Sequence, residues 1–132
     1  MSARQVCQIA IWNVTVAAFL AGSVFAEDVE LSRREKSSLG KRCREAIQLR
    51  ADDNLGSDIL SAKIARVFEV EEGVLGFTGT YSAKKLIRYS GLIKGEVFVE
   101  DGKVGDIDQL HFKSEYMDAY QEVEQKYLEE VN

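Results

Sequence analysis

Two side chains in this sequence could form a nucleophile and its base: Cys43 and the single histidine, His111. A thiol beside an imidazole is a common catalytic pair. Cys43 falls on the apolar stripe of a predicted helix, however, where burial raises the pKa of a thiol and suppresses its reactivity. We therefore expect no catalytic residues. The alternative is a small thiol-dependent enzyme or redox protein that uses Cys43.

The sequence predicts neither a metal site nor a cofactor. One histidine, without a second histidine or a cysteine pair, does not make a usual zinc site. A short acidic segment resembles a calcium loop in composition, but it lacks the spacing and the closing glutamate of an EF-hand. The glycines Gly73, Gly76 and Gly79 lie in a strand region and indicate a bulge or the close approach of a helix, not a nucleotide loop. The acidic segment contains Asp52, Asp53, Asn54 and Asp58.

Two segments carry residues suited to binding. The first is basic and aromatic, and its candidate residues are Lys84, Lys85, Arg88 and Tyr89. With exposed Leu86 and Ile87 it could contact an anionic lipid or an acidic partner; alternatively, it is a solvated loop whose Leu86 or Ile87 packs into the core. The second is a stripe of tyrosines that would either dock a partner or cover the protein's own sheet. Its candidate residues are Tyr116, Tyr120 and Tyr127.

A helix is predicted from about Leu31 to Arg50, ahead of both segments. Gly40 weakens its middle, so two shorter helices that meet near Gly40 are a second possibility. The apolar residues of this helix recur at helical spacing and define one face. They are Leu39, Cys43, Ala46 and Ile47.

Four strands in the order of a meander are predicted after this helix. They span 62–71, 74–82, 92–100 and 104–107, with a helix as the alternative for 58–66. In the first strand, Ile64, Phe68 and Val70 are expected on one face. The segment 83–91 is expected to be a connection, and His111 is expected in a linker. Asp101-Gly102 is the strongest hairpin signal of the chain.

A second helix is predicted from Ser114 to Val131. Tyr116, Tyr120, Val123 and Tyr127 are spaced 4, 3 and 4 apart, which places them on one stripe. This C-terminal helix (residues 113–132) would dock on the sheet or project from it. The predicted fold is therefore α+β: an N-terminal helix on a four-stranded antiparallel meander, with a C-terminal amphipathic helix.

Residues 1–26 are typical of a secretory signal peptide. Arg4 precedes an apolar stretch from Ile9 to Leu20, and Val24 and Ala26 suit the small pockets of a signal peptidase. Cleavage after Ala26 would leave 106 of the 132 residues, enough for one domain, 27–132. We expect a protein that is exported, either to the periplasm or outside the cell, without stable membrane insertion after cleavage.

Charge and cysteine content narrow the class of partner. The chain has a formal charge of −5, and since segment 1–26 holds Arg4 and no acid, residues 27–132 carry −6. This acidity argues against nucleic acid, which needs a dense basic face. Cleavage would also remove Cys7, so that Cys43 is buried, reactive or cross-linked between chains. The expected function is that of a non-enzymatic binding protein, with another protein as a candidate partner and the oligomeric state left open.

From Cys43 to Asp108 the layout resembles a loose group of small exported bacterial domains of unassigned function. In that group a helix with a cysteine precedes an antiparallel meander. The resemblance implies export and an α+β fold, and it implies no activity. The helix-to-strand disulfide of that group would be absent, because no cysteine stands near Phe98. The counterparts here are Cys43-Arg44-Glu45-Ala46, Gly76-Phe77-Thr78-Gly79-Thr80-Tyr81, Gly91, Phe98 and Asp101-Gly102.

Overall fold

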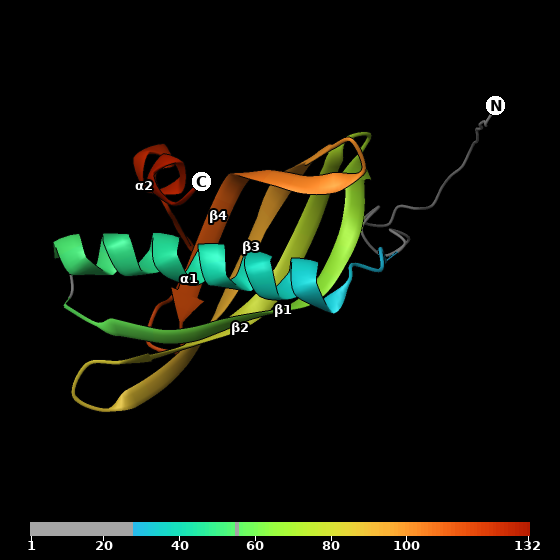
Figure 1. Ribbon diagram of the computed structural model, residues 1–132. Helices are drawn as coiled ribbons and strands as arrows, with labels where there is room; N and C mark the ends of the chain where they lie inside the picture. The colour runs from blue at the N-terminus through green and yellow to red at the C-terminus, as the bar shows by residue number, and fades with distance from the viewer. Residues whose placement is uncertain (1–27, 55) are drawn as a thin grey trace.

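The computed structural model describes residues 28–54 and 56–132. The expected signal peptide, Cys7 and the expected first mature residue lie outside the described residues. The predicted α+β fold is confirmed: an N-terminal helix packs on an antiparallel meander, and a short C-terminal helix follows (Figure 1). The elements are α1 (Arg33–Asn54), β1 (Asp58–Glu71), β2 (Val74–Lys84), β3 (Arg88–Glu100), β4 (Lys103–Ser114), β5 (Gln121–Glu122) and α2 (Gln125–Val131).

Helix α1 is continuous through Gly40, so the single predicted helix is found and the alternative of two shorter helices is wrong. The helix begins with a serine N-cap, in which the Ser32 hydroxyl accepts a hydrogen bond from the Glu35 backbone N–H at 3.1 Å. Gly40 does not interrupt the helix; it allows the helix to pack against the sheet. A Cβ atom at this position would lie 2.7 Å from the carbonyl oxygen of Ala62 in β1. The missing side chain therefore lets the helix approach the strand closely.

The sheet has the order β1-β2-β3-β4-β5, and every neighbouring pair is antiparallel. β1 is irregular, with three register shifts along its pairing with β2. Because one shift falls between Ile64 and Arg66, the strand changes phase there: Ile64 and Val67 are buried, whereas Phe68 is only half-buried and Val70 is exposed. The expectation that Ile64, Phe68 and Val70 share one face is therefore wrong.

β4 is three times the length expected for it, because two shifts of register hide its periodicity. Val97 pairs with Ile107 and Glu96 with Gln109, so an extra residue lies between them on β4. The buried residues of the strand, Ile107, Leu110 and Phe112, consequently depart from strict alternation. His111 lies inside this strand and not in a linker.

The core lies between α1 and one face of the sheet, which we call the inner face. Leu39, Cys43 and Ile47 of α1 are fully buried against it. Aromatic rings of β2 cover glycines of β3 on this face: Phe77 is paired with Gly95, and Tyr81 with Gly91. Cβ atoms at those glycines would come within 2.7 Å of the rings. The core residues and the apolar residues packed against them lie between Val29 and Val131, so the chain from 27 to 132 contains the whole described core.

The predicted helix from Ser114 to Val131 is wrong in its first half. Residues 115–124 form turns and the short strand β5, and only Gln125–Val131 is helical. Backbone groups of this segment bond to the sheet instead: Glu115 donates to the Ser90 carbonyl at 3.0 Å, and Val123 donates to the Leu110 carbonyl at 2.8 Å. Helix α2 docks beside α1, where Tyr127 and Leu128 are buried.

Candidate functional site

The turn between β2 and β3 presents two aliphatic side chains to solvent. The strands run further than predicted, to Lys84 and from Arg88, so that only Lys85, Leu86 and Ile87 form the turn. Leu86 is 90% exposed and Ile87 is 66% exposed. The alternative in which one of them packs into the core is therefore wrong. Figure 1 shows this turn at one extremity of the molecule, beyond the body of the sheet.

Cations surround these two side chains. Lys84, Lys85 and Arg88 are all exposed, and no acidic residue lies between positions 84 and 89. Within the described part of the chain, none of the three forms an ion pair. Asp58 stands opposite Lys84 in the strand register, and it reduces the local positive charge without cancelling it.

A cleft of about 420 Å³ opens beside the turn. Its wall is aromatic: the rings of Tyr89 and Tyr116 meet with their centroids 5.9 Å apart and their planes tilted by 60°. Tyr89 packs against the core, whereas Tyr116 is 68% exposed. The structure therefore brings together one residue from each predicted binding segment. The cleft is lined by Ser57, Lys85, Leu86, Ile87, Tyr89, Ser114, Tyr116 and Met117.

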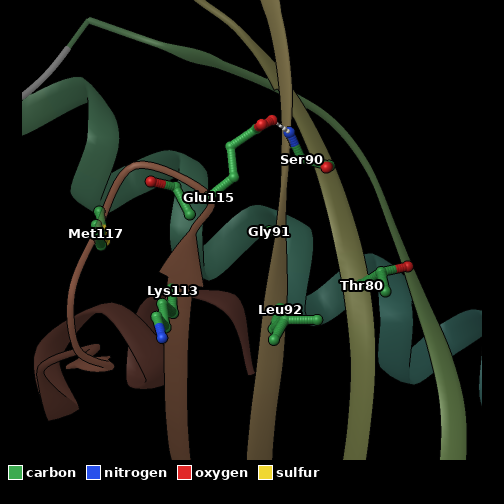
Figure 2. Close-up of a pocket in the computed structure, with 8 residues that line it drawn as sticks. Thr80, Ser90, Gly91, Leu92, Lys113, Glu115 and Met117 are labelled. Atoms are coloured by element: carbon green, nitrogen blue, oxygen red, sulfur yellow. Dashed lines mark hydrogen bonds between the residues drawn. The ribbon is translucent and has the colours of Figure 1, made fainter.

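A second hollow, of about 400 Å³, adjoins this cleft on the face of the sheet opposite α1 (Figure 2). Thr80, Leu92 and Lys113 form a row across β2, β3 and β4. Figure 2 shows the Glu115 carboxylate reaching back to the backbone of Ser90, whose N–H donates to it at 3.0 Å. Ser114 and Met117 line both hollows, so the segment after β4 forms the ridge between them.

Hydrogen bonds hold that ridge in place. Ser114 is buried, and its hydroxyl accepts a bond from the Tyr116 backbone N–H at 3.2 Å. The Ser114 carbonyl accepts a second bond from the Met117 N–H at 3.0 Å. Together with the bonds between Glu115 and Ser90, these contacts fix the position of Tyr116. The backbone that carries the Tyr116 ring of the aromatic wall is thus held by hydrogen bonds.

The other two predicted tyrosines lie elsewhere. Tyr120 is half-buried, with the Lys94 ammonium 4.2 Å from its ring centroid. Tyr127 is buried in α2, and its hydroxyl donates a hydrogen bond to the Asp53 carboxylate at the end of α1. This bond raises the pKa of the Tyr127 hydroxyl. Tyr127 therefore joins the two helices, and the expected stripe of three tyrosines is not assembled.

Cys43 and His111 do not form a catalytic pair. Cys43 is 0% exposed between α1 and the inner face of the sheet, whereas half-buried His111 lines a separate hollow on the opposite face together with Tyr120. Burial raises the pKa of the Cys43 thiol to about 12. Of the three states left open for Cys43, the structure shows the buried one.

Sequence reasoning missed three residues of the cleft: Ser57, Ser114 and Met117. Ser57 and Met117 come from connections that only the fold brings together. Ser114 was expected to begin a helix, and its burial depends on the unexpected length of β4. The sequence did contain a local signal for the turn beside the cleft. Lys85, Leu86 and Ile87 include none of the residues that usually form turns.

Across residues 28–54 and 56–132, no group of three or more His, Cys, Asp or Glu side chains could hold a metal ion. No helix in that part of the chain is long and apolar enough to cross a bilayer. Comparisons with protein-family models, with curated proteins and with solved structures found no significant match to this chain.

Proposed function

We propose that this protein is a non-enzymatic binding protein that acts after export, and that it binds through the β2–β3 turn and the cleft beside it. The observation that supports this proposal most is the turn itself. Leu86 and Ile87 are left in water at a position where polar residues or glycine would be more stable. Residues that do not suit their local backbone conformation, and that gain no packing contacts in exchange, are typical of functional surfaces.

The cleft also has the form of a binding site. Its volume falls within the range of sites for small ligands or single side chains, and most of its lining is apolar. Lys85 at its rim supplies a positive charge. The preferred occupant is therefore an apolar group that carries a negative charge nearby.

An anionic, apolar fluorescent dye such as anilinonaphthalene sulfonate tests this proposal. We expect saturable binding of one dye per chain to the folded protein. The double substitution Leu86→Ser/Ile87→Ser should weaken binding by roughly tenfold. Phe98→Ser is the matched control, since Phe98 is an exposed apolar residue near the opposite end of β3. Equal affinity of wild type and the double variant would refute the proposed site.

The export part of the proposal has its own test. The chain should lose residues 1–26 when it is secreted, and its intact mass should correspond to a start at Glu27. Recovery of the full-length chain with the membrane fraction would contradict export in soluble form.

A further inference from the structure

We infer that the partner of the β2–β3 turn is an anionic membrane surface, which the turn contacts peripherally through Leu86 and Ile87; this inference rests on the proposed binding site. The two side chains stand at the end of a protruding hairpin. A protruding tip fits a protein only if the partner offers a matching pocket. A lipid layer needs no such pocket, because its headgroup region deforms around apolar side chains.

The residues around the tip suit the layers of a membrane interface. Lys84, Lys85 and Arg88 flank the aliphatic side chains, where they would meet lipid phosphates. Tyr89 and Tyr116 stand behind the tip, and tyrosine rings are favoured at the level of the headgroups. From the tip of the hairpin toward the body of the protein, the side chains are therefore aliphatic first, then cationic, then aromatic.

The charge distribution along the sheet would orient the molecule with this end toward anionic lipid. Lys113, near the cleft, adds to the cations of the turn. Glu115 and Asp58 oppose them, but these two carboxylates are outnumbered by the four cations Lys84, Lys85, Arg88 and Lys113. The opposite end of the sheet carries the turns Glu72-Gly73 and Asp101-Gly102, and it is acidic. Its acids are Glu69, Glu71, Glu72, Glu100 and Asp101, and the bases beside them include Lys103 and Arg42, whose guanidinium donates to the Gly105 carbonyl at 2.8 Å.

A tryptophan reporter tests the inference. Trp12 is the only tryptophan of the chain, so Ile87→Trp in the protein 27–132 gives a single tryptophan, at the tip, which can be excited selectively over the five tyrosines. We expect a blue shift of its emission with phosphatidylcholine vesicles that contain roughly 30% phosphatidylglycerol. The shift should be lost in about 0.5 M salt, because screening weakens the attraction of the cations. Phe98→Trp, as the matched reporter near the other end of β3, should show no shift.

A second variant separates the charges from the apolar tip. Lys84→Gln/Lys85→Gln/Arg88→Gln in the Ile87→Trp background should reduce partitioning to the anionic vesicles by roughly 100-fold, because three cations at about 1 kcal/mol each sum to about 3 kcal/mol. An equal shift with pure phosphatidylcholine vesicles would overturn the role of anionic lipid.

The absence of any vesicle response, while the dye still binds, would overturn the membrane inference and leave the proposed binding site intact. Dimerisation of the wild type that Leu86→Ser/Ile87→Ser abolishes would identify a second copy as the occupant. Either result would refute membrane docking.

Discussion

The turns at the two ends of the sheet are built from different kinds of residue. At one end, the β1–β2 and β3–β4 turns use Gly73, Asp101 and Gly102, all with positive φ, and the Val99 N–H ties the two hairpins together by donating to the Gly73 carbonyl at 2.8 Å. At the other end, the β2–β3 turn is made of Lys85, Leu86 and Ile87. The first end follows the rules for stable turns. The second end departs from them, and we attribute the departure to binding.

The same contrast holds between the inner face and the exposed turn. Both hold large apolar side chains, but α1 covers the first, whereas water covers the second. The inner face should therefore govern the free energy of unfolding, and the turn should govern binding. The following predictions test this separation, from the largest expected change in stability to the smallest.

Phe77→Ala should lower the free energy of unfolding by about 3–5 kcal/mol. Phe77 is fully buried, and its ring also covers Gly95. Urea denaturation measures the change. A loss below about 1 kcal/mol would show that the inner face is not the stabilising core that we describe.

Gly40→Ala should destabilise the protein by about 1–3 kcal/mol. In an isolated helix the same substitution would stabilise by about 1 kcal/mol, so the sign of the change is diagnostic. The new Cβ atom would lie 2.7 Å from the Ala62 carbonyl oxygen, and a backbone atom cannot yield as a flexible side chain can. An increase in melting temperature would contradict the close approach of α1 to β1.

Cys43 should make the stability depend on alkaline pH. Burial raises the pKa of its thiol from 9.0 to about 12, so the native state keeps its proton where the unfolded chain loses it. The contribution of Cys43 is therefore complete below pH 9.0 and falls as the pH rises toward about 12, by at most about 1.4 kcal/mol per pH unit.

Cys43→Ala provides the control for that dependence. The variant should lose about 1–2 kcal/mol near neutral pH through its small cavity, and the difference from wild type should shrink above pH 9.0. A difference that stays constant with pH would mean that the thiol reaches solvent. Tyr81, whose pKa burial also raises, is present in both proteins and cancels.

Leu86→Ser/Ile87→Ser should change the free energy of unfolding by no more than about 0.5 kcal/mol. Both side chains are exposed, so their loss opens no cavity. Thermal melts of the variant and of wild type should coincide. A large loss of stability would place these residues in the core and remove the argument that they are kept for binding.

The sequence predicted helices and strands correctly where the spacing of apolar residues and the residues of the flanking turns indicated the same element. The face of α1 that holds Leu39 and Cys43 and the Asp101-Gly102 hairpin were both foreseeable, because each depends on neighbouring residues. The two extra residues in β4 were not, because each bulge shifts the phase of the alternation. Only the bulge between Val104 and Ile107 contains a glycine, Gly105, and the one at Asp108 has no glycine or proline to mark it.

The prediction of a C-terminal helix from Ser114 was wrong for a different reason. Tyr116, Tyr120, Val123 and Tyr127 have helical spacing, but the backbone of 115–124 gains its hydrogen bonds from β3 and β4. Such tertiary pairing cannot be read from local periodicity. For the same reason, the contact between Tyr89 and Tyr116 could not be foreseen, although both residues were predicted separately as binding candidates.

The separation of a stabilising inner face from a binding turn is tested most directly by amide proton–nitrogen correlation spectra of isotope-labelled protein 27–132 during titration with the anionic dye. Shift changes should concentrate at Lys84–Tyr89 and Ser114–Met117, with the turns at Gly73 and Gly102 unaffected. Changes centred on Tyr120 or on the Gly73 end of the sheet, with the β2–β3 turn unperturbed, would contradict the account.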